Sequence, residues 1–115
     1  MRVMIICVLL LLVTSNSVSA EMTVNIYKAN KDKQAMQLYI LGLFHGYGWA
    51  NAFLIREGKS PVYCEPEKLQ FELEDLIYIL DREIKAAEEE NKLKPDMPIG
   101  LFLLIGLCKD FRCKK

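Results

Sequence analysis

The sequence predicts a small all-α protein, a bundle of three to four helices closed by one disulfide. Three observations support this fold class. Apolar residues recur at helical spacing in stretches that follow residue 29, and glycine or proline separates these stretches. Two cysteines, Cys64 and Cys113, lie far apart along a chain that begins with an export signal.

The export signal occupies residues 1–20. Met1-Arg2 is a basic start, residues 3–13 form an unbroken apolar run, and Val18-Ser19-Ala20 places small residues before a cleavage site. The apolar run of about 11 residues is too short to span ~30 Å of hydrocarbon, which argues against a membrane anchor. We therefore expect a cleaved signal peptide followed by a single exported domain, residues 21–115, that lies outside the membrane.

Composition narrows the class of partner. The chain carries 15 basic and 15 acidic residues and no basic stripe, which argues against nucleic acid as the partner. A domain of this length has a modest core, so a disulfide contributes a large share of its stability.

Three cysteines remain after the signal peptide, which takes Cys7 with it. In an oxidising compartment this odd number indicates one bridge and one free thiol. In the chain-entropy model a disulfide would stabilise the fold by ~4 kcal/mol whether it joined Cys64 to Cys113 or Cys64 to Cys108. This energy therefore does not decide between the two pairings. Cys108 continues an apolar helical pattern as a small buried hydrophobe, whereas Cys113 lies in a polar tail. This favours Cys64–Cys113. The cysteine and histidine spacings match no structural zinc pattern, so we expect no metal site.

The first predicted helix begins at an Asn30 N-cap and stops before Gly58. Residues 22–29 precede it as a leader without an assigned structure. The rest of the helix surface is apolar apart from one polar face, which predicts that this helix is the central and most buried one. The polar face holds Asn30, Lys33, Gln34, Gln37, His45, Gly48 and Asn51. One stripe of this helix contains Ala35, Tyr39, Gly42, Gly46, Ala50 and Phe53.

Glycines are unusually frequent in this helix. Each glycine inside a helix costs about 1 kcal/mol relative to alanine, so their presence needs a structural reason. Gly42, Gly46 and Ala50 are four residues apart, which predicts a groove of small residues against which another helix packs closely. A membrane helix is the alternative interpretation, and the polar residues His45 and Asn51 argue against it.

The second predicted helix opens at Pro66 and runs to about Glu90. Its apolar stripe consists of Leu69, Leu73, Leu76, Ile77, Leu80, Ile84 and Ala87. Phe71 and Tyr78 lie seven residues apart on the other side, beside Glu74 and Asp75. Exposed aromatic residues with a charged rim are typical of protein interfaces. The alternative is that they pack under the leader or in a homodimer contact.

The third predicted helix follows a loop at residues 91–97 and starts at Pro98. Residues 99–107 are almost wholly apolar, which predicts a buried helix that closes the core and leads to Cys113. The chain offers little for catalysis, since His45 is its only histidine and has no identifiable nucleophile partner. No glycine-rich phosphate loop follows a strand. We therefore expect that the protein is not an enzyme and that it binds no cofactor.

Four motifs occur in order along the chain: Tyr39 to Gly42 with Gly46 and Ala50-Asn51, then Tyr63-Cys64-Glu65-Pro66, then Met97-Pro98-Ile99, and finally Gly106-Leu107 followed by Phe111-Arg112-Cys113. In these motifs the chain resembles a known family, the immunity proteins for type VI secretion amidase effectors. The resemblance spans roughly residues 38–113. Two positions depart from the family pattern, because Arg112 replaces a common proline and His45 a common acidic residue.

The resemblance implies a small, helical, periplasmic protein, often a homodimer, that binds a peptidoglycan amidase effector and occludes its active-site cleft. For the amidase contact we expect Phe71, Glu74, Asp75 and Tyr78, together with the loop 92–96 that contains Lys94 and Asp96. The alternative function is a periplasmic acid-stress chaperone, whose clustered carboxylates would respond to low pH, or a helical binding protein without an amidase partner.

Overall fold

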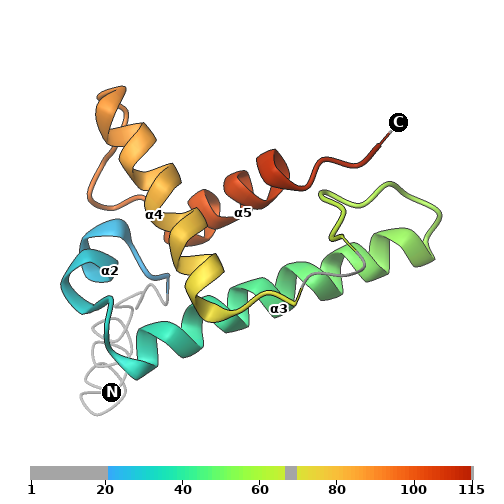
Figure 1. Cartoon of the computed structure of the whole chain (residues 1–115), viewed down its shortest axis with the longest axis horizontal. Coiled ribbons are helices and arrows are strands. Elements are labelled where there is room, and N and C mark those ends of the chain that lie inside the picture. The colour runs from blue at the N-terminus through green and yellow to red at the C-terminus, as the bar shows by residue number, and fades with distance from the viewer. Residues whose placement is uncertain (1–20, 67–69, 115) are drawn as a thin grey trace, which may run out of the picture.

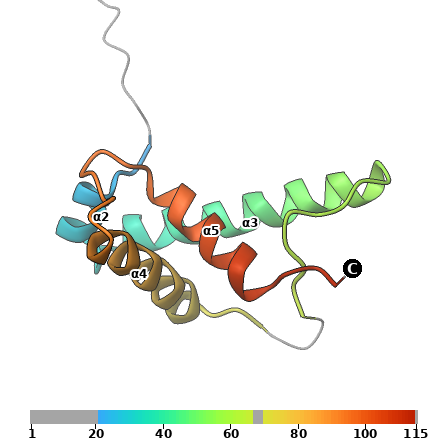
Figure 2. The same ribbon diagram turned by 90° about the horizontal axis from the view of Figure 1, so that it is seen from above.

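The computed structural model describes residues 21–66 and 70–114, and over these residues the protein is all-α (Figure 1). The predicted signal peptide, residues 1–20, lies outside the described residues. Four helices are described: α2 (Val24–Asn30), α3 (Gln34–Arg56), α4 (Leu73–Glu89) and α5 (Ile99–Asp110). α3 is the long axis of the molecule, with α4 and α5 packed on one side of it and α2 near its start (Figures 1 and 2). The predicted helical bundle closed by one disulfide is confirmed.

The leader at residues 22–29 is largely helical, and Asn30 ends α2 rather than starting α3. Thr23 caps α2, because its hydroxyl oxygen accepts a hydrogen bond from the Ile26 amide at 3.4 Å. Asn30 donates from Nδ2 to the Ile26 carbonyl at 2.9 Å, so its side chain is used at the end of the helix. The predicted Asn30 N-cap is therefore wrong, and α3 starts at Gln34 after Lys33.

Helix α2 is fixed to the rest of the bundle at both ends. The Val24 amide donates to the Met97 carbonyl at 2.9 Å, which ties the start of α2 to the segment before α5. At the other end, the Tyr27 hydroxyl donates to Asp81 of α4 at 2.7 Å, and Lys31 forms an ion pair with the same carboxylate. Burial, and then the contact with Asp81, raises the pKa of Tyr27.

Helix α4 starts seven residues later than predicted. The carboxylate of Asp75 accepts a hydrogen bond from the Glu72 amide at 2.9 Å, and this capping arrangement fixes the first turn at Leu73 rather than at Pro66. The predicted apolar stripe is confirmed where it is described: Leu76, Leu80 and Ile84 are buried, and Leu73, Ile77 and Ala87 are half-buried. Leu69 lies outside the described residues.

Helix α5 begins at Ile99 and is buried over much of its length, as predicted. It approaches α4 closely at Gly106, where a Cβ atom would lie 2.3 Å from Cγ2 of Ile79 and 3.1 Å from Cγ of Glu83. The two helices lie side by side (Figure 2) and contribute many of the buried core residues.

Replacing Gly106 with alanine is expected to lower the free energy of unfolding by about 2 kcal/mol, because the added methyl group overlaps Ile79 in a close-packed core. Urea unfolding followed by circular dichroism measures the loss. Gly48→Ala is the matched control: a Cβ atom there meets nothing within 4 Å, and alanine is favoured over glycine inside a helix. A Gly106→Ala variant as stable as the Gly48→Ala variant contradicts this close approach.

The predicted central position of α3 is wrong. Among the described helices it is the one long and apolar enough to cross a membrane, judged by length and composition alone, yet only Met36, Ile40 and Asn51 are buried along it. Its inner side joins α5, since the Tyr47 hydroxyl donates to the Gly100 carbonyl at 2.6 Å. None of the other described helices packs against its opposite side.

Candidate functional site

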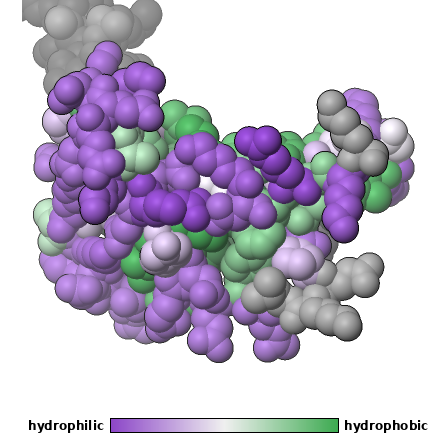
Figure 3. Space-filling model, turned by 45° about the horizontal axis from the view of Figure 1, so that its top comes forward, coloured by the Kyte–Doolittle hydropathy of each residue, from purple (hydrophilic) through white to green (hydrophobic). Residues whose placement is uncertain are grey.

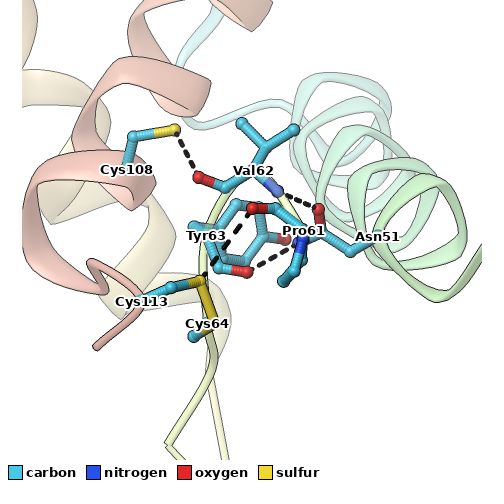
Figure 4. The surroundings of a disulfide bond; sticks show 7 residues. All are labelled: Asn51, Pro61, Val62, Tyr63, Cys64, Cys108 and Cys113. Carbon is cyan, nitrogen blue, oxygen red and sulfur yellow. Dashed lines mark hydrogen bonds between the residues drawn. A yellow bond between two sulfur atoms is a disulfide. The ribbon is translucent and has the colours of Figure 1, made fainter. Parts of the chain in front are cut away.

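The disulfide pairs Cys64 with Cys113, as the sequence predicts. It joins the segment that follows α3 to the tail that follows α5 (Figure 4). Next to it, the Cys64 amide donates a hydrogen bond to the Phe111 carbonyl at 2.7 Å. The two segments are therefore linked by one covalent and one backbone contact.

Asn51 of α3 holds the same segment from the opposite side. Its Oδ1 accepts from the Val62 amide at 2.8 Å, and its Nδ2 donates to the Tyr63 carbonyl at 3.0 Å. The Asn51 side chain is buried, and the Tyr63 side chain is only 1 % exposed. We refer to Asn51, Val62, Tyr63, Cys64 and Cys113 as the latch. Figure 4 shows Asn51 and Cys113 on opposite sides of the 61–64 segment.

Cys108 is the free cysteine among the described residues. It is half-buried, and its Sγ lies 3.6 Å from the Val62 carbonyl oxygen, beside the latch. Burial raises the pKa of the Cys108 thiol, which favours the neutral thiol over the reactive thiolate. The predicted role as a small apolar residue agrees with this position, although its burial is only partial.

Phe71 and Tyr78 do not share one helical face. Phe71 precedes α4 and is half-buried, with its ring centroid 5.0 Å from that of Phe44 and 4.9 Å from that of Phe111. Tyr78 is 68 % exposed on α4. Packing is therefore the main role of Phe71, and the predicted pair of exposed aromatic residues is reduced to one.

The side chains of Phe71 and Tyr78 nevertheless meet at a shallow hollow of about 180 Å³. We call it the Tyr78 hollow; its lining residues are Phe71, Asp75, Tyr78, Ile79, Asp110 and Phe111. Asp75 also caps α4, so it has a structural role that the sequence analysis missed. Arg82 lies 6.0 Å above the Tyr78 ring and pairs with Asp110 at 2.9 Å. Glu74 is exposed nearby.

Lys94 and Asp96 are exposed on the loop between α4 and α5, as predicted. The backbone of this loop is fixed: the Pro95 carbonyl accepts from the Asn25 amide at 3.1 Å, and the Lys94 amide contacts Sδ of Met97 at 3.4 Å. Viewed from the α4 and α5 side, the surface is largely hydrophilic (Figure 3).

Several large apolar side chains are exposed on α3, which was predicted to be the most buried helix. Four residues define what we call the α3 outer face: Leu38, Gly42, Gly46 and Phe53. Leu38 and Phe53 are both 60 % exposed, and a Cβ atom at either glycine would meet nothing within 4 Å. Nearby Trp49 is the most exposed large hydrophobic residue among those that the structure describes, at 78 %. The sequence did not mark this face as exposed, because residues 34–55 contain no Asp, Glu, Lys or Arg on either side of the helix.

His45 is exposed on α3, with its ring 6.1 Å from that of Phe44. Within residues 21–66 and 70–114, no group of three His, Cys, Asp or Glu side chains is placed to hold a metal ion.

Comparisons with models of protein families, with curated proteins and with solved structures found no match to this chain.

Proposed function

We propose that this protein is a periplasmic immunity protein that binds a peptidoglycan amidase effector of type VI secretion and occludes its active-site cleft. One observation carries the proposal: residues from three motifs of the family resemblance, Asn51, Tyr63-Cys64 and Cys113, meet in the latch. They are far apart in the sequence. A shared structural role explains why these residue types occur together.

The disulfide supports the proposed location. Disulfides form and persist in oxidising compartments such as the bacterial periplasm, and the Cys64–Cys113 bridge agrees with the export signal at residues 1–20. An amidase that cuts peptidoglycan acts in that compartment, so the inhibitor must reach it too.

The Tyr78 hollow is the proposed amidase contact. An exposed tyrosine beside a concave surface, with the acidic side chains of Glu74, Asp75 and Asp110 around it, has the composition of an interface anchor with a polar rim. The loop with Lys94 and Asp96 is a second, peripheral contact in the proposal. Phe71 and Phe111 form the wall of the hollow.

Replacing Tyr78 with alanine is expected to weaken amidase binding by about 2 kcal/mol, roughly 30-fold, because an aromatic anchor at the centre of an interface is lost. Isothermal titration calorimetry with a purified amidase measures the change. Lys85→Ala is the control, since Lys85 is exposed on the same side of α4, two turns further along. Equal affinities for the two variants would remove the Tyr78 hollow from the interface.

We propose in addition that two copies pair through the α3 outer face. A hollow of about 480 Å³ lies over Gly42 and Gly46 on the same helix, two turns before Phe53, and is walled by Tyr39 and Tyr47. A two-fold interface needs a self-complementary surface, and a protruding Phe53 with a hollow further along the same helix offers one, because each copy can place its Phe53 in the hollow of the other. The uncharged surface of α3 favours such burial.

Phe53→Glu is expected to convert the dimer to a monomer without loss of helix content, because the charge enters the apolar contact and Phe53 is exposed in one copy. Sedimentation equilibrium measures the mass. Gln34→Glu adds the same charge at an exposed position near the start of α3 and should leave the dimer intact. A wild-type protein that is monomeric at high micromolar concentration contradicts the pairing.

A further inference from the structure

A groove runs along one side of α3, between the second half of this helix and the 61–65 segment. It consists of two adjoining hollows of about 350 and 370 Å³. Gly48, Ala52 and Glu65 line both hollows and so form the middle of the groove. Because Gly48 and Ala52 are small, the floor is open: a Cβ atom at Gly48 would meet nothing within 4 Å.

The walls of the groove are apolar. Ile55 and Pro61 line one hollow, and Phe44 and Trp49 line the other. Trp49 is the only tryptophan in the sequence, and its indole is 78 % exposed. Exposure of such a large apolar side chain to water does not stabilise the fold of a single copy of the protein. The face of the indole ring is, however, a strong binding surface for a cation.

Glu65 places a negative charge in the middle of these apolar walls. Its Oε1 accepts a hydrogen bond from the Tyr63 hydroxyl at 3.4 Å. Within the described part of the chain, no basic side chain lies within ion-pair distance of Glu65. The carboxylate is exposed and therefore accessible to a partner. His45 lies on the rim of the Trp49 hollow and is the other titratable group there.

We propose that this groove binds an arginine side chain from a loop of the partner protein. The planar guanidinium group lies on the face of Trp49 and pairs with the carboxylate of Glu65, while its alkyl stem contacts Gly48 and Ala52. Arginine fits this combination better than lysine, because its planar, weakly hydrated group stacks on an aromatic ring and donates two parallel hydrogen bonds to a carboxylate.

The groove extends the contact surface already proposed. Phe44 lines the Trp49 hollow and packs on Phe71, which packs on Phe111 at the wall of the Tyr78 hollow. This row of three aromatic rings lies between the two concave sites. One partner loop on each site would give an interface with two anchors, and the identity of the partner as an amidase rests on the proposed function.

The fluorescence of Trp49 reports binding directly, since no other tryptophan contributes. The probe is the blocked peptide acetyl-Gly-Arg-Gly-amide, titrated at millimolar concentrations into oxidised residues 21–115 at pH 8, where free histidine is uncharged. The matched probe carries citrulline, which has the same shape without the charge. We expect a saturable change with the arginine peptide and none with citrulline.

Glu65→Gln is expected to weaken binding of the arginine peptide about tenfold, because the charge-assisted contact is lost while the indole remains. Glu57→Gln is the control, as it removes a carboxylate at the exposed end of α3, outside the groove. An equal response to the two peptides, no saturable response at all, or an unchanged affinity in Glu65→Gln would overturn the inference.

The groove assignment and the proposed immunity function can fail independently of each other. If an amidase is inhibited but the peptide does not bind, the groove assignment is wrong and the immunity function stands. If the peptide binds through Glu65 and no amidase is inhibited, the groove binds an arginine of a different protein and the immunity function fails.

Discussion

Replacing Cys113 with serine is expected to lower the free energy of unfolding by about 4 kcal/mol. The Cys64–Cys113 bridge closes a loop with a sequence separation of 49 residues, and the loss of that constraint mainly increases the entropy of the unfolded chain. A small domain has a total stability of only ~5–15 kcal/mol. The bridge therefore accounts for a large part of the stability of this domain.

Urea unfolding of the oxidised protein and of the Cys113→Ser variant measures this difference. Cys108→Ser is the control, because it removes the thiol that lies beside the latch and leaves the bridge intact. It should change stability far less. If the Cys113→Ser variant unfolds at the same urea concentration as wild type, the bridge does not contribute as argued.

Asn51→Ala is expected to cost about 3 kcal/mol, because it leaves the Val62 amide and the Tyr63 carbonyl without their hydrogen-bond partner in a largely buried region. Asn51→Asp keeps an acceptor for the Val62 amide and loses the donor to the Tyr63 carbonyl. It places a charge in a buried site, so it should also be destabilising. Gln34→Ala, an exposed amide on the same helix, is the control.

The effects of Asn51→Ala and Cys113→Ser should not add. Both changes release the 61–64 segment, and residues that act on one segment show coupling of 0.5 to about 3 kcal/mol. The double variant should lose less stability than the sum of the single losses. Strict additivity would show that Asn51 and the disulfide stabilise the fold independently, which contradicts the latch as a unit.

The disulfide, the apolar stripe of α4 and the position of α5 could be predicted from the sequence. The stripe is clear because α4 has one apolar side and an acidic remainder, so only one face can be buried. The position of α5 follows from Pro98 and a continuous apolar run. The cysteine pairing follows from placement: Cys108 lies within a helix, and Cys113 lies beyond its end.

The burial of α3 could not be predicted because apolar residues surround this helix. Helical spacing assigns residues to faces, but it does not say which face the rest of the chain covers. Met36 and Ile40 face the core, whereas Gly42 and Gly46 face open space. Glycines at that spacing are compatible with a partner helix from the same chain or from another molecule.

Two helix starts differ from the prediction, each for its own local reason. Pro66 and Asn30 are both good helix starts by residue type, yet α4 starts after Glu72 and α3 after Lys33. At Glu72 the Asp75 carboxylate supplies the cap; at Asn30 the preceding residues already form α2. The later start of α4 removes Phe71 from the helix, which is why the expected exposed pair of Phe71 and Tyr78 is not found.

The most direct test of the proposed function is the titration of a purified type VI peptidoglycan amidase with oxidised residues 21–115 at neutral pH, with peptidoglycan hydrolysis as the readout. We expect a stoichiometric loss of activity that is complete at one inhibitor per amidase. Full activity in excess protein for every amidase tested would contradict the immunity function. Capture of unfolded proteins only after acidification would instead favour the chaperone.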